Sequence, residues 1–515
     1  MNTPLTYHDT RDLTDATATF TDVVVKGIAD GGGLFVPSEI PSLSSDEIIG
    51  LVKTPYWERA ATVFEHFGVD LPSAHIATLM QAAYGSQWDD ERIAPVIEVC
   101  PGFHVLELWH GPTSAFKDMA LQCMPLTFSA AVDLAWQRGT LAEDYLILVA
   151  TSGDTGKAAL EGFADREHTK IVVFYPAGGV SDLQYKQMVT QRGENLAVFG
   201  VRGNFDDCQS AVKAAFSDED FTRELAERHR LRLSSANSIN WGRLLPQIAY
   251  YVSAYADMVA SGGVKAGQCI NACVPTGNFG NILAAYYARE MGVPIGRLVC
   301  ASNENAVLAD FIATGCYDIS ERGFVTTPSP SMDILVSSNL ERLLYHLAGA
   351  GKVREWMAAL ASEKRFEVDP DTFDAIRSLF VGGSVNNDGS LATIRQVFAE
   401  DGYLLDPHTA VAWAVAKKTS GDAPMLIVST AHWAKFGADV LKALTDVPYA
   451  NALPAVYDGL TGVQLLEKVR ELTGGRCAPI PAPLAGLDAA KIRFAEVVDT
   501  GRESVEDALR GWLET

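Results

Sequence analysis

The sequence predicts an α/β protein built on open, mostly parallel β-sheets. Two observations support this fold class. Short, continuously apolar runs alternate with longer amphipathic stretches, and a strand covered by helices on both faces is apolar without interruption. Several of these runs also lead directly into turns of small residues that precede a helical pattern, as strand–turn–helix units do. The runs cover residues 145–150, 171–175, 196–199, 271–275, 298–301 and 424–429.

The order of these patterns divides the chain into three parts. The first part mixes short helical patterns with a glycine-rich loop, which indicates a small N-terminal domain. The alternating strands and helices form the second and largest part. A stretch marked by proline and glycine then leads to a final amphipathic helix, which we treat as a C-terminal extension. These parts are residues 1–92, 93–445 and 446–515.

The composition is that of a folded globular chain with a strong negative charge. Of its 515 residues, 48% are hydrophobic and 20% are charged, which excludes a disordered or coiled-coil protein. Acidic residues outnumber basic residues by 64 to 41, so the net charge is -23. This charge disfavours nucleic acid or an anionic membrane as a partner. A negatively charged substrate must therefore be bound by a local group of cations.

Cysteine usage and the absence of targeting patterns favour a cytoplasmic protein. The eight cysteines include no CxxC pair and are typical of reduced thiols. The first 20 residues lack a basic region followed by an apolar stretch, and no apolar run approaches the roughly 18 residues needed to span a bilayer. No set of His, Cys or carboxylate side chains has the spacing of metal ligands, so no metal site is expected.

A turn of small residues, Thr276–Asn281, follows the apolar run at 271–275. It has two glycines three positions apart and precedes a helical pattern. Glycines let main-chain N–H groups converge, and the positive end of the next helix adds to them, so the turn suits a phosphate. An ordinary strand-to-helix turn explains this pattern alone equally well. The chain has neither a GxGxxG nor a Walker A motif, which disfavours dinucleotide and nucleoside-triphosphate sites.

A second turn, Thr151–Lys157, follows the apolar run at 145–150 and is rich in hydroxyl groups. Hydroxyls and free N–H groups suit the carboxylate or phosphate of a small substrate. Ser and Thr at a helix start act more often as N-caps, and the pattern alone favours that interpretation.

Lys117 lies between an aromatic residue, Phe116, and the start of an apolar helical pattern. Loss of hydration lowers the pKa of a lysine, and the neutral amine can then form a Schiff base with an aldehyde. A single lysine is far more often solvated at the surface. Its position alone therefore does not identify a catalytic residue.

Taken together, these segments resemble the threonine synthase family of pyridoxal-phosphate enzymes, which have the fold type II, or tryptophan-synthase-β-like, architecture. The likeness extends over nearly the whole chain. The segments that carry it are GPTSAFKD at 111–118, ATSGDTG at 150–156, NSINWGR at 237–243, PTGNFGN at 275–281 and STAH at 429–432, with further matches at 30–37, 205–209 and 406–411.

The resemblance implies two open, mostly parallel-sheet subdomains beside the small N-terminal domain, the segment at about 140–262 being a mobile inner subdomain. The cofactor would be pyridoxal 5′-phosphate, bound through a Schiff base to Lys117, which would also move protons. Thr430 would lie at the ring nitrogen, where a neutral hydroxyl leaves that nitrogen largely unprotonated. The cofactor phosphate would be held by Gly277, Asn278, Phe279, Gly280 and Asn281.

The reaction implied by the resemblance converts O-phospho-L-homoserine and water to L-threonine and phosphate by β,γ-elimination and replacement. An arginine at the substrate phosphate could bind two oxygens at once. We expect a monomer or a homodimer. The candidate substrate contacts are Ser152, Asp154 and Thr155 for the carboxylate and the region of the cofactor O3′, and Ser238, Asn240 and Arg243 for the phosphate.

Some positions depart from the family pattern. Lys157 stands where a small residue is expected, Asn281 where an acidic residue is common, and Trp433 where proline is usual. Lys157 could alter the substrate pocket, but no departure removes a proposed catalytic group. His408 follows an Asp-Pro helix start, which favours a structural role. His432 is expected to pack beside the cofactor ring without transferring a proton.

Three alternatives remain open at this stage. A phospho-lyase would use the same two phosphate sites but release 2-oxobutyrate from O-phosphohomoserine. A dehydratase acting on free serine or threonine would have no need of Arg243. A non-catalytic binder of a phosphorylated ligand would keep the fold without a cofactor bound to Lys117, and it would therefore be colourless.

Overall fold

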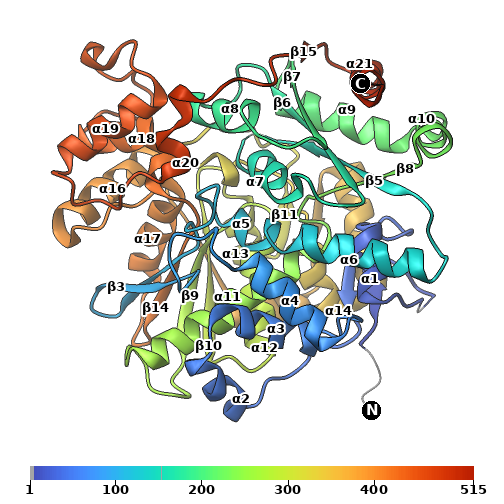
Figure 1. The fold of residues 1–515 in the computed structure, drawn as a ribbon. Helices are drawn as coiled ribbons and strands as arrows, with labels where there is room; N and C mark the ends of the chain where they lie inside the picture. The colour runs from blue at the N-terminus through green and yellow to red at the C-terminus, as the bar shows by residue number, and fades with distance from the viewer. Residues whose placement is uncertain (1–4, 15, 152, 515) are drawn as a thin grey trace.

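The computed structural model describes residues 5–14, 16–151 and 153–514, which form an α/β structure around two large sheets (Figure 1). The six-stranded sheet has the order β13-β10-β9-β14-β4-β3, and only the pair β3–β4 is antiparallel. Its strands are β3 (Val96–Cys100), β4 (Phe103–Glu107), β9 (Ile270–Pro275), β10 (Ile295–Ser302), β13 (Phe380–Ser384) and β14 (Met425–Ser429). The predicted fold class, with open and mostly parallel sheets, is confirmed.

The five-stranded sheet is parallel throughout, with the order β15-β7-β6-β5-β8. Its central strands are buried on both faces, because helices cover each side, and this explains their uninterrupted apolar sequence. Its strands are β5 (Asp144–Ala150), β6 (Thr169–Pro176), β7 (Leu196–Val201), β8 (Leu231–Ser234) and β15 (Val497–Val498). Each predicted apolar run in both sheets coincides with a strand.

The N-terminal part packs on α6 (Met124–Gln137) and α11 (Trp241–Ala260) through a continuous apolar core. Its two short strands pair antiparallel, and the glycine-rich loop lies against Asp9. A Cβ atom at Gly33 would lie 1.9 Å from Asp9 Oδ1, so this close approach requires glycine. The elements are β1 (Tyr7–Asp9), α1 (Phe20–Lys26), β2 (Phe35–Pro37), α2 (Ser45–Gly50), α3 (Tyr56–His66) and α4 (Ser73–Ala83).

The remaining helices cover the two sheets or connect them, and a separate two-stranded antiparallel sheet, β11 (Cys316–Asp318) with β12 (Arg365–Glu367), lies outside them. The helix α14 is interrupted at Gly349. The helices are α5 (Lys117–Leu121), α6 (Met124–Gln137), α7 (Asp154–Phe163), α8 (Asp182–Val189), α9 (Phe205–Ser217), α10 (Glu219–Glu224), α11 (Trp241–Ala260), α12 (Gly280–Glu290), α13 (Val307–Thr314), α14 (Leu340–Glu363), α15 (Pro370–Leu379), α16 (Asn387–Asp401) and α17 (Pro407–Thr419).

The C-terminal segment contacts both sheets in turn. Helices α18 (Gly437–Leu444), α19 (Gly462–Leu472) and α20 (Ala482–Ala485) form one end of the molecule beside α16 and α17 (Figure 1). The chain then crosses to the five-stranded sheet, where β15 pairs with β7 and α21 (Arg502–Leu513) packs on α9. The amphipathic helix predicted near 503–513 is confirmed.

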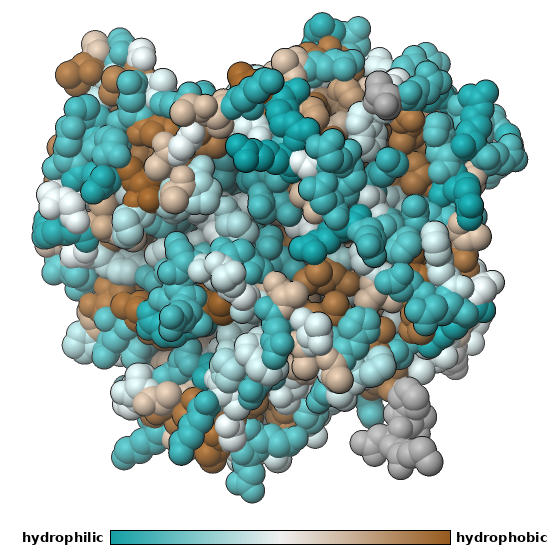
Figure 2. Space-filling view, in the orientation of Figure 1, coloured by the Kyte–Doolittle hydropathy of each residue, from teal (hydrophilic) through white to brown (hydrophobic). Residues whose placement is uncertain are grey.

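Hydrophilic side chains predominate on the face shown in Figure 2, and apolar residues occur there in small, separate groups. None of the described helices is long and apolar enough to cross a membrane.

Candidate active site

Two loops bring Lys117 and Thr430 to the same place. The main-chain N–H of Phe116 donates to Thr430 O at 2.7 Å, and the N–H of His432 donates to Ser114 O at 3.1 Å. These two hydrogen bonds join the loop before α5 to the loop after β14, so residues more than 300 positions apart form one wall. The geometry depends on Ser114, whose φ of 60° lies in the left-handed region.

The Lys117 amine is buried among polar groups, and Lys117 is the first residue of the short helix α5. Lys117 is only 8% exposed, and its Nζ donates to Ser331 Oγ at 3.0 Å. Burial lowers its pKa to about 8; Asp154 opposes that shift, whereas the cations Arg243 and Lys435 add to it. A substantial fraction of the amine is therefore neutral just above physiological pH, as a nucleophile requires.

The carboxylate of Asp154 lies between two lysines at the start of α7. Its Oδ2 is 3.8 Å from Lys117 Nζ, and its Oδ1 is 3.1 Å from Lys435 Nζ. Gln184 also donates to Oδ1 at 3.1 Å. Burial raises the pKa of Asp154, but the two ammonium groups outweigh this effect and hold the pKa well below its usual range. Asp154 is therefore ionised, and its direct contact with a substrate carboxylate stays a prediction.

The turn before α7 is closed by a threonine hydroxyl. Thr151 Oγ1 accepts from the N–H groups of Gly153 at 3.0 Å and Gly156 at 2.9 Å, so it binds one N–H of the first helical turn although the N-cap residue is Gly153. Thr155 is half-buried in the first turn of the helix, and Ser152 lies outside the described residues. The ammonium of Lys157 binds Glu161 on the next turn of the same helix, at 2.7 Å.

The turn after β9 presents a row of main-chain N–H groups. Gly277 O accepts from Ser337 Oγ at 2.6 Å, and Asn278 O accepts from the N–H of Asn339 at 3.1 Å. The C=O and N–H of one peptide group point in opposite directions. The N–H groups of Asn278 and Phe279 therefore face away from residues 337–339. No acceptor among the described residues takes an N–H of residues 277–282. This edge can bind an anion such as phosphate.

Gly277 also lies against the loop that contacts the lysine. A Cβ atom at this position would be 2.8 Å from Ser331 O and 3.1 Å from Met332 Cα. Ser331 is therefore packed between Gly277 and Lys117. The side chain of Asn281 lies elsewhere, because its Oδ1 accepts from the hydroxyls of Tyr250 and Tyr251 at 2.6 Å each. Within the described chain its Nδ2 has no hydrogen-bond partner.

His408 holds the Ser331 loop in place. Its Nε2 accepts from the N–H of Ser331 at 3.2 Å, and its Nδ1 lies 3.0 Å from Asp406 Oδ1. Since Nε2 is an acceptor, the proton is on Nδ1, which donates to Asp406. Asp406 also caps α17 through the N–H groups of His408 and Thr409, as the predicted helix start requires. The structural role expected for His408 agrees with these contacts.

Arg243 is a buried cation without a carboxylate partner among the described residues. Its side chain is 4% exposed; Nη1 donates to Ala236 O, and Nε has no acceptor in the described chain. Burial lowers its pKa to about 10, so the guanidinium remains charged at neutral pH. It also lies close enough to Lys117 to affect that amine. An unpaired guanidinium with a free donor is suited to an anion.

The two other residues proposed for the substrate phosphate have different contacts. Asn240 caps α11, its Oδ1 accepting from the N–H of Gly242 at 2.9 Å, and its Nδ2 donates to Val24 O at 2.8 Å. Asn240 is fully buried, and both polar atoms of its side chain have protein partners. Ser238 contributes its carbonyl oxygen to Arg342 Nη1 at 3.3 Å, and its hydroxyl is half-buried.

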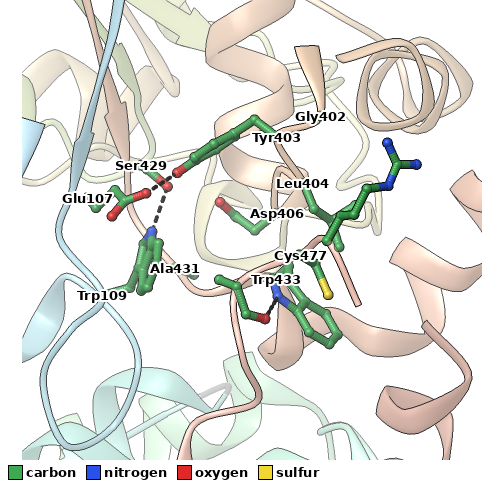
Figure 3. A pocket seen from close by; sticks show the side chains of 12 residues that line it. Glu107, Trp109, Gly402, Tyr403, Leu404, Asp406, Ser429, Ala431, Trp433 and Cys477 are labelled. Carbon is green, nitrogen blue, oxygen red and sulfur yellow. Dashed lines mark hydrogen bonds between the residues drawn. The ribbon is translucent and has the colours of Figure 1, made fainter. Parts of the chain in front are cut away.

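A small cavity of about 60 Å³ lies beside the end of β14 (Figure 3). Its wall includes Ser429 and Ala431, which flank Thr430, but not Lys117 or Arg243. Trp109 donates to Ser429 Oγ at 3.0 Å, and the hydroxyl of Tyr403 donates to Glu107 Oε1 at 2.6 Å. This cavity therefore lies next to the proposed ring-nitrogen position and is separate from the cluster around Lys117.

His432 and Trp433 have packing roles at this cavity. Burial lowers the pKa of His432 to about 3, so its ring is neutral, and it meets Trp109 edge-on at 4.7 Å between ring centres. Its Nδ1 accepts from the N–H of Ala434. Trp433 donates to Ala478 O at 2.9 Å and so ties the loop to the C-terminal segment.

The site also includes residues that sequence reasoning missed. Ser331 and Lys435 contact Lys117 or its partner Asp154, and Gln184 reaches Asp154 from α8. The sequence holds one signal for Lys435, because it is a single charged residue in an apolar stretch that directly follows the segment at 429–432. Nothing in the sequence around Ser331 or Gln184 distinguishes them from surface residues.

These residues fit pyridoxal phosphate. A buried amine with a lowered pKa lies near unused main-chain N–H groups, and the absence of a side chain at Gly277 lets the Ser331 loop pack closely between that turn and the amine. The same cluster holds two further cations, Arg243 and Lys435, and two carboxylates, Asp154 and Asp118. Local cations of this kind suit an anionic ligand despite the net charge of the whole chain.

Comparisons with known proteins agree with this geometry. Three family descriptions match the chain: "Threonine synthase N terminus" at residues 6–84, "Pyridoxal-phosphate dependent enzyme" at 98–431, and "Threonine synthase, C-terminal" at 409–509. The threonine synthase of Pseudomonas aeruginosa is 37% identical over 475 residues, covering 91% of this chain and 94% of that protein. The crystal structure of pyridoxal-phosphate-bound threonine synthase from Brucella melitensis has 36% identity and a TM-score of 0.84, covering 99% of this chain and 100% of that chain.

Human "Threonine synthase-like 1" is 44% identical over 436 residues, which is 82% of this chain. The aligned region spans only 58% of the human protein's length. The bound cofactor in the Brucella structure and the match at 98–431 support pyridoxal phosphate as the cofactor of this chain.

Proposed function

Because this chain belongs to the threonine synthase family of pyridoxal-phosphate-dependent enzymes, we propose that it converts O-phospho-L-homoserine and water to L-threonine and phosphate. One observation carries the proposal: the buried Lys117 amine lies near a second buried cation, Arg243, that has no carboxylate partner in the described chain. A cofactor phosphate and a substrate phosphate need two separate anion sites, and the site offers both.

The first anion site is the edge of N–H groups at residues 277–282, which would hold the cofactor phosphate. Lys117 would bind the cofactor aldehyde, and Thr430 would face the ring nitrogen with a neutral hydroxyl. When bound, the cofactor supplies an electron sink that stabilises negative charge at Cα and Cβ of the substrate. The hydrogen bonds between residues 114–116 and 430–432 fix the positions of Lys117 and Thr430 relative to each other.

The second anion site is Arg243, which would bind the substrate phosphate and position the Cγ–O bond for cleavage. Its Nε is an unused donor, and a guanidinium can bind two phosphate oxygens together. The amino-acid carboxylate would be bound by the turn before α7, where Ser152 and Thr155 are candidates. Asp154 carries a negative charge that repels this carboxylate, so our proposal pairs Asp154 with Lys117 and leaves its predicted contact with the substrate carboxylate untested.

Lys117 would also move protons. A lysine with a pKa of about 8 can accept a proton and return it near neutral pH, because neither form is strongly favoured. The reaction needs proton removal at Cα and Cβ and protonation at Cγ and Cα. Lys117 is the buried amine available for these transfers, and Ser331 Oγ can hold it between them.

The names of the relatives favour considering a second function. The human relative, at 44% identity, is named threonine synthase-like, whereas the relatives named threonine synthase are 35–37% identical. The alternative is a phospho-lyase that releases 2-oxobutyrate from O-phosphohomoserine. Both functions use Lys117 and Arg243, so only the product separates them.

The test incubates the purified, cofactor-loaded protein with O-phosphohomoserine and separates the products. Threonine and phosphate in equal amounts are the expected result. Phosphate with 2-oxobutyrate and no threonine would contradict the proposal and favour the phospho-lyase. Free serine and threonine are tested in parallel, because turnover of these amino acids that is independent of Arg243 would indicate a dehydratase.

A further inference from the structure

Lys435 is a fully engaged buried lysine. It is 2% exposed and lies in a 3₁₀ turn, Trp433–Phe436, directly after the loop that follows β14. Its Nζ contacts Thr113 O at 3.2 Å, Gln187 Oε1 at 2.5 Å and Asp154 Oδ1 at 3.1 Å. An ammonium group has three donors, and the described residues supply an acceptor for each. Lys435 therefore has no donor left for a ligand.

The three acceptors belong to both halves of the molecule. Thr113 lies in the loop between β4 and Lys117, and this loop is attached to the six-stranded sheet through β4. Asp154 belongs to α7, which packs on the five-stranded sheet, and Gln187 belongs to α8, which packs on α7. Lys435 thus joins the two sheets directly beside the Lys117 amine. Burying the ammonium of Lys435 costs hydration free energy, which its contacts with Asp154, Gln187 and Thr113 offset.

We propose that Lys435 is a positioning residue for Lys117: its ammonium holds the Asp154 carboxylate across the interface of the two sheets and thereby keeps part of the Lys117 amine neutral. This inference rests on the proposed function, in which Lys117 binds the cofactor. The cofactor aldehyde reacts only with a neutral amine. Lys435 therefore controls how readily the protein binds its cofactor at neutral pH.

The charges around Lys117 determine the direction of the effect. Asp154 from α7 and Asp118 from its own helix favour the protonated amine, whereas Arg243 from α11 and Lys435 oppose it. His408 from α17 lies close enough to Asp154 to contribute to lowering the pKa of that carboxyl. Removing Lys435 takes away a repelling cation and leaves Asp154 to Lys117 alone, so both changes favour protonated Lys117. Removing the charge of Asp154 has the opposite effect.

The experiment measures cofactor capture by the cofactor-free protein as a function of pH. Pyridoxal phosphate is added, the near-visible absorption of the lysine-bound cofactor is followed, and borohydride reduction with peptide mapping identifies the lysine. For Lys435→Met we expect the pH midpoint of the capture rate to rise by about one unit, as for the loss of one nearby like charge. For Asp154→Asn we expect a shift in the opposite direction.

Three further variants separate the explanations. Lys435→Arg keeps the charge and should keep the wild-type midpoint. Lys157→Met removes a partly buried, ion-paired lysine on α7, whose ammonium contacts Glu161 and Gln191, and should also keep the wild-type midpoint. Lys117→Ala should bind no cofactor covalently. Covalent capture by this variant would overturn the proposed function. The pH shift of Lys435→Met is measured separately from this result.

A midpoint for Lys435→Met equal to that of the wild type, or shifted in the same direction as that of Asp154→Asn, would overturn the inference. If Lys435→Met fails to fold by circular dichroism, Lys435→Gln, which removes the charge and keeps a hydrogen-bond donor, takes its place. A raised midpoint for Lys435→Gln supports the inference, and an unchanged midpoint overturns it.

Discussion

Replacing Arg243 with methionine tests whether its guanidinium binds the substrate phosphate. Methionine fills much of the same space and removes the charge, so the change isolates the electrostatic contact. The Arg243 side chain is buried and its Nε lacks an acceptor in the described chain. A phosphate would therefore meet a desolvated guanidinium with no competing carboxylate.

The size of the effect follows from this burial. Loss of one partner of a buried, hydrogen-bonded charge pair costs about 2–5 kcal/mol, and each 1.4 kcal/mol is a factor of ten. With the side chain 4% exposed, solvent screening is weak and the upper half of that range applies. We expect kcat/KM for O-phosphohomoserine to fall by about 10³-fold. Arg243→Lys keeps the charge but not the two-oxygen geometry and should lose less.

Replacing Arg243 with methionine should not destabilise the ligand-free protein, although it lowers activity. A buried cation without a counter-charge destabilises the folded state, so the thermal midpoint of Arg243→Met should stay the same or rise. Inorganic phosphate should stabilise the cofactor-loaded wild type against heat but not this variant. A kcat/KM within threefold of the wild type, or equal stabilisation of both proteins by phosphate, would refute the reasoning.

Three further predictions concern single residues. Lys117→Ala should abolish the near-visible absorption and the activity together; a variant that keeps either one would show that another group binds the cofactor. Gly277→Ala should destabilise the protein by about 1–3 kcal/mol and weaken cofactor binding, because its Cβ would meet Ser331 O at 2.8 Å. Gly323→Ala, with no atom within 4 Å of the new Cβ, is the matched control in urea unfolding and cofactor titration. Asn240→Ala should lower the free energy of unfolding by about 1–2 kcal/mol through loss of a helix cap, and an unchanged urea midpoint would contradict that role.

The elements that the sequence predicted best are those whose pattern is local. The apolar runs became β5, β6, β9 and β14 because strands buried on both faces must be apolar at every position. The helix start before His408 was readable for a similar reason, since a capping aspartate acts on its own next residues. The roles of Lys117 and of the turn at 277–281 came from family resemblance, because a buried and an exposed lysine look alike in sequence.

The sequence by itself determined the α/β class, the strands and the family of this protein, because repeating patterns and long motifs are properties of contiguous residues. Only the tertiary structure decided which side chains surround the Lys117 amine. Ser331 lies 214 positions from Lys117, and Lys435 approaches Asp154 from the other sheet. Such contacts depend on how two sheets and their connecting loops pack, and the pKa of the amine depends on their summed charge and burial, which no local pattern specifies.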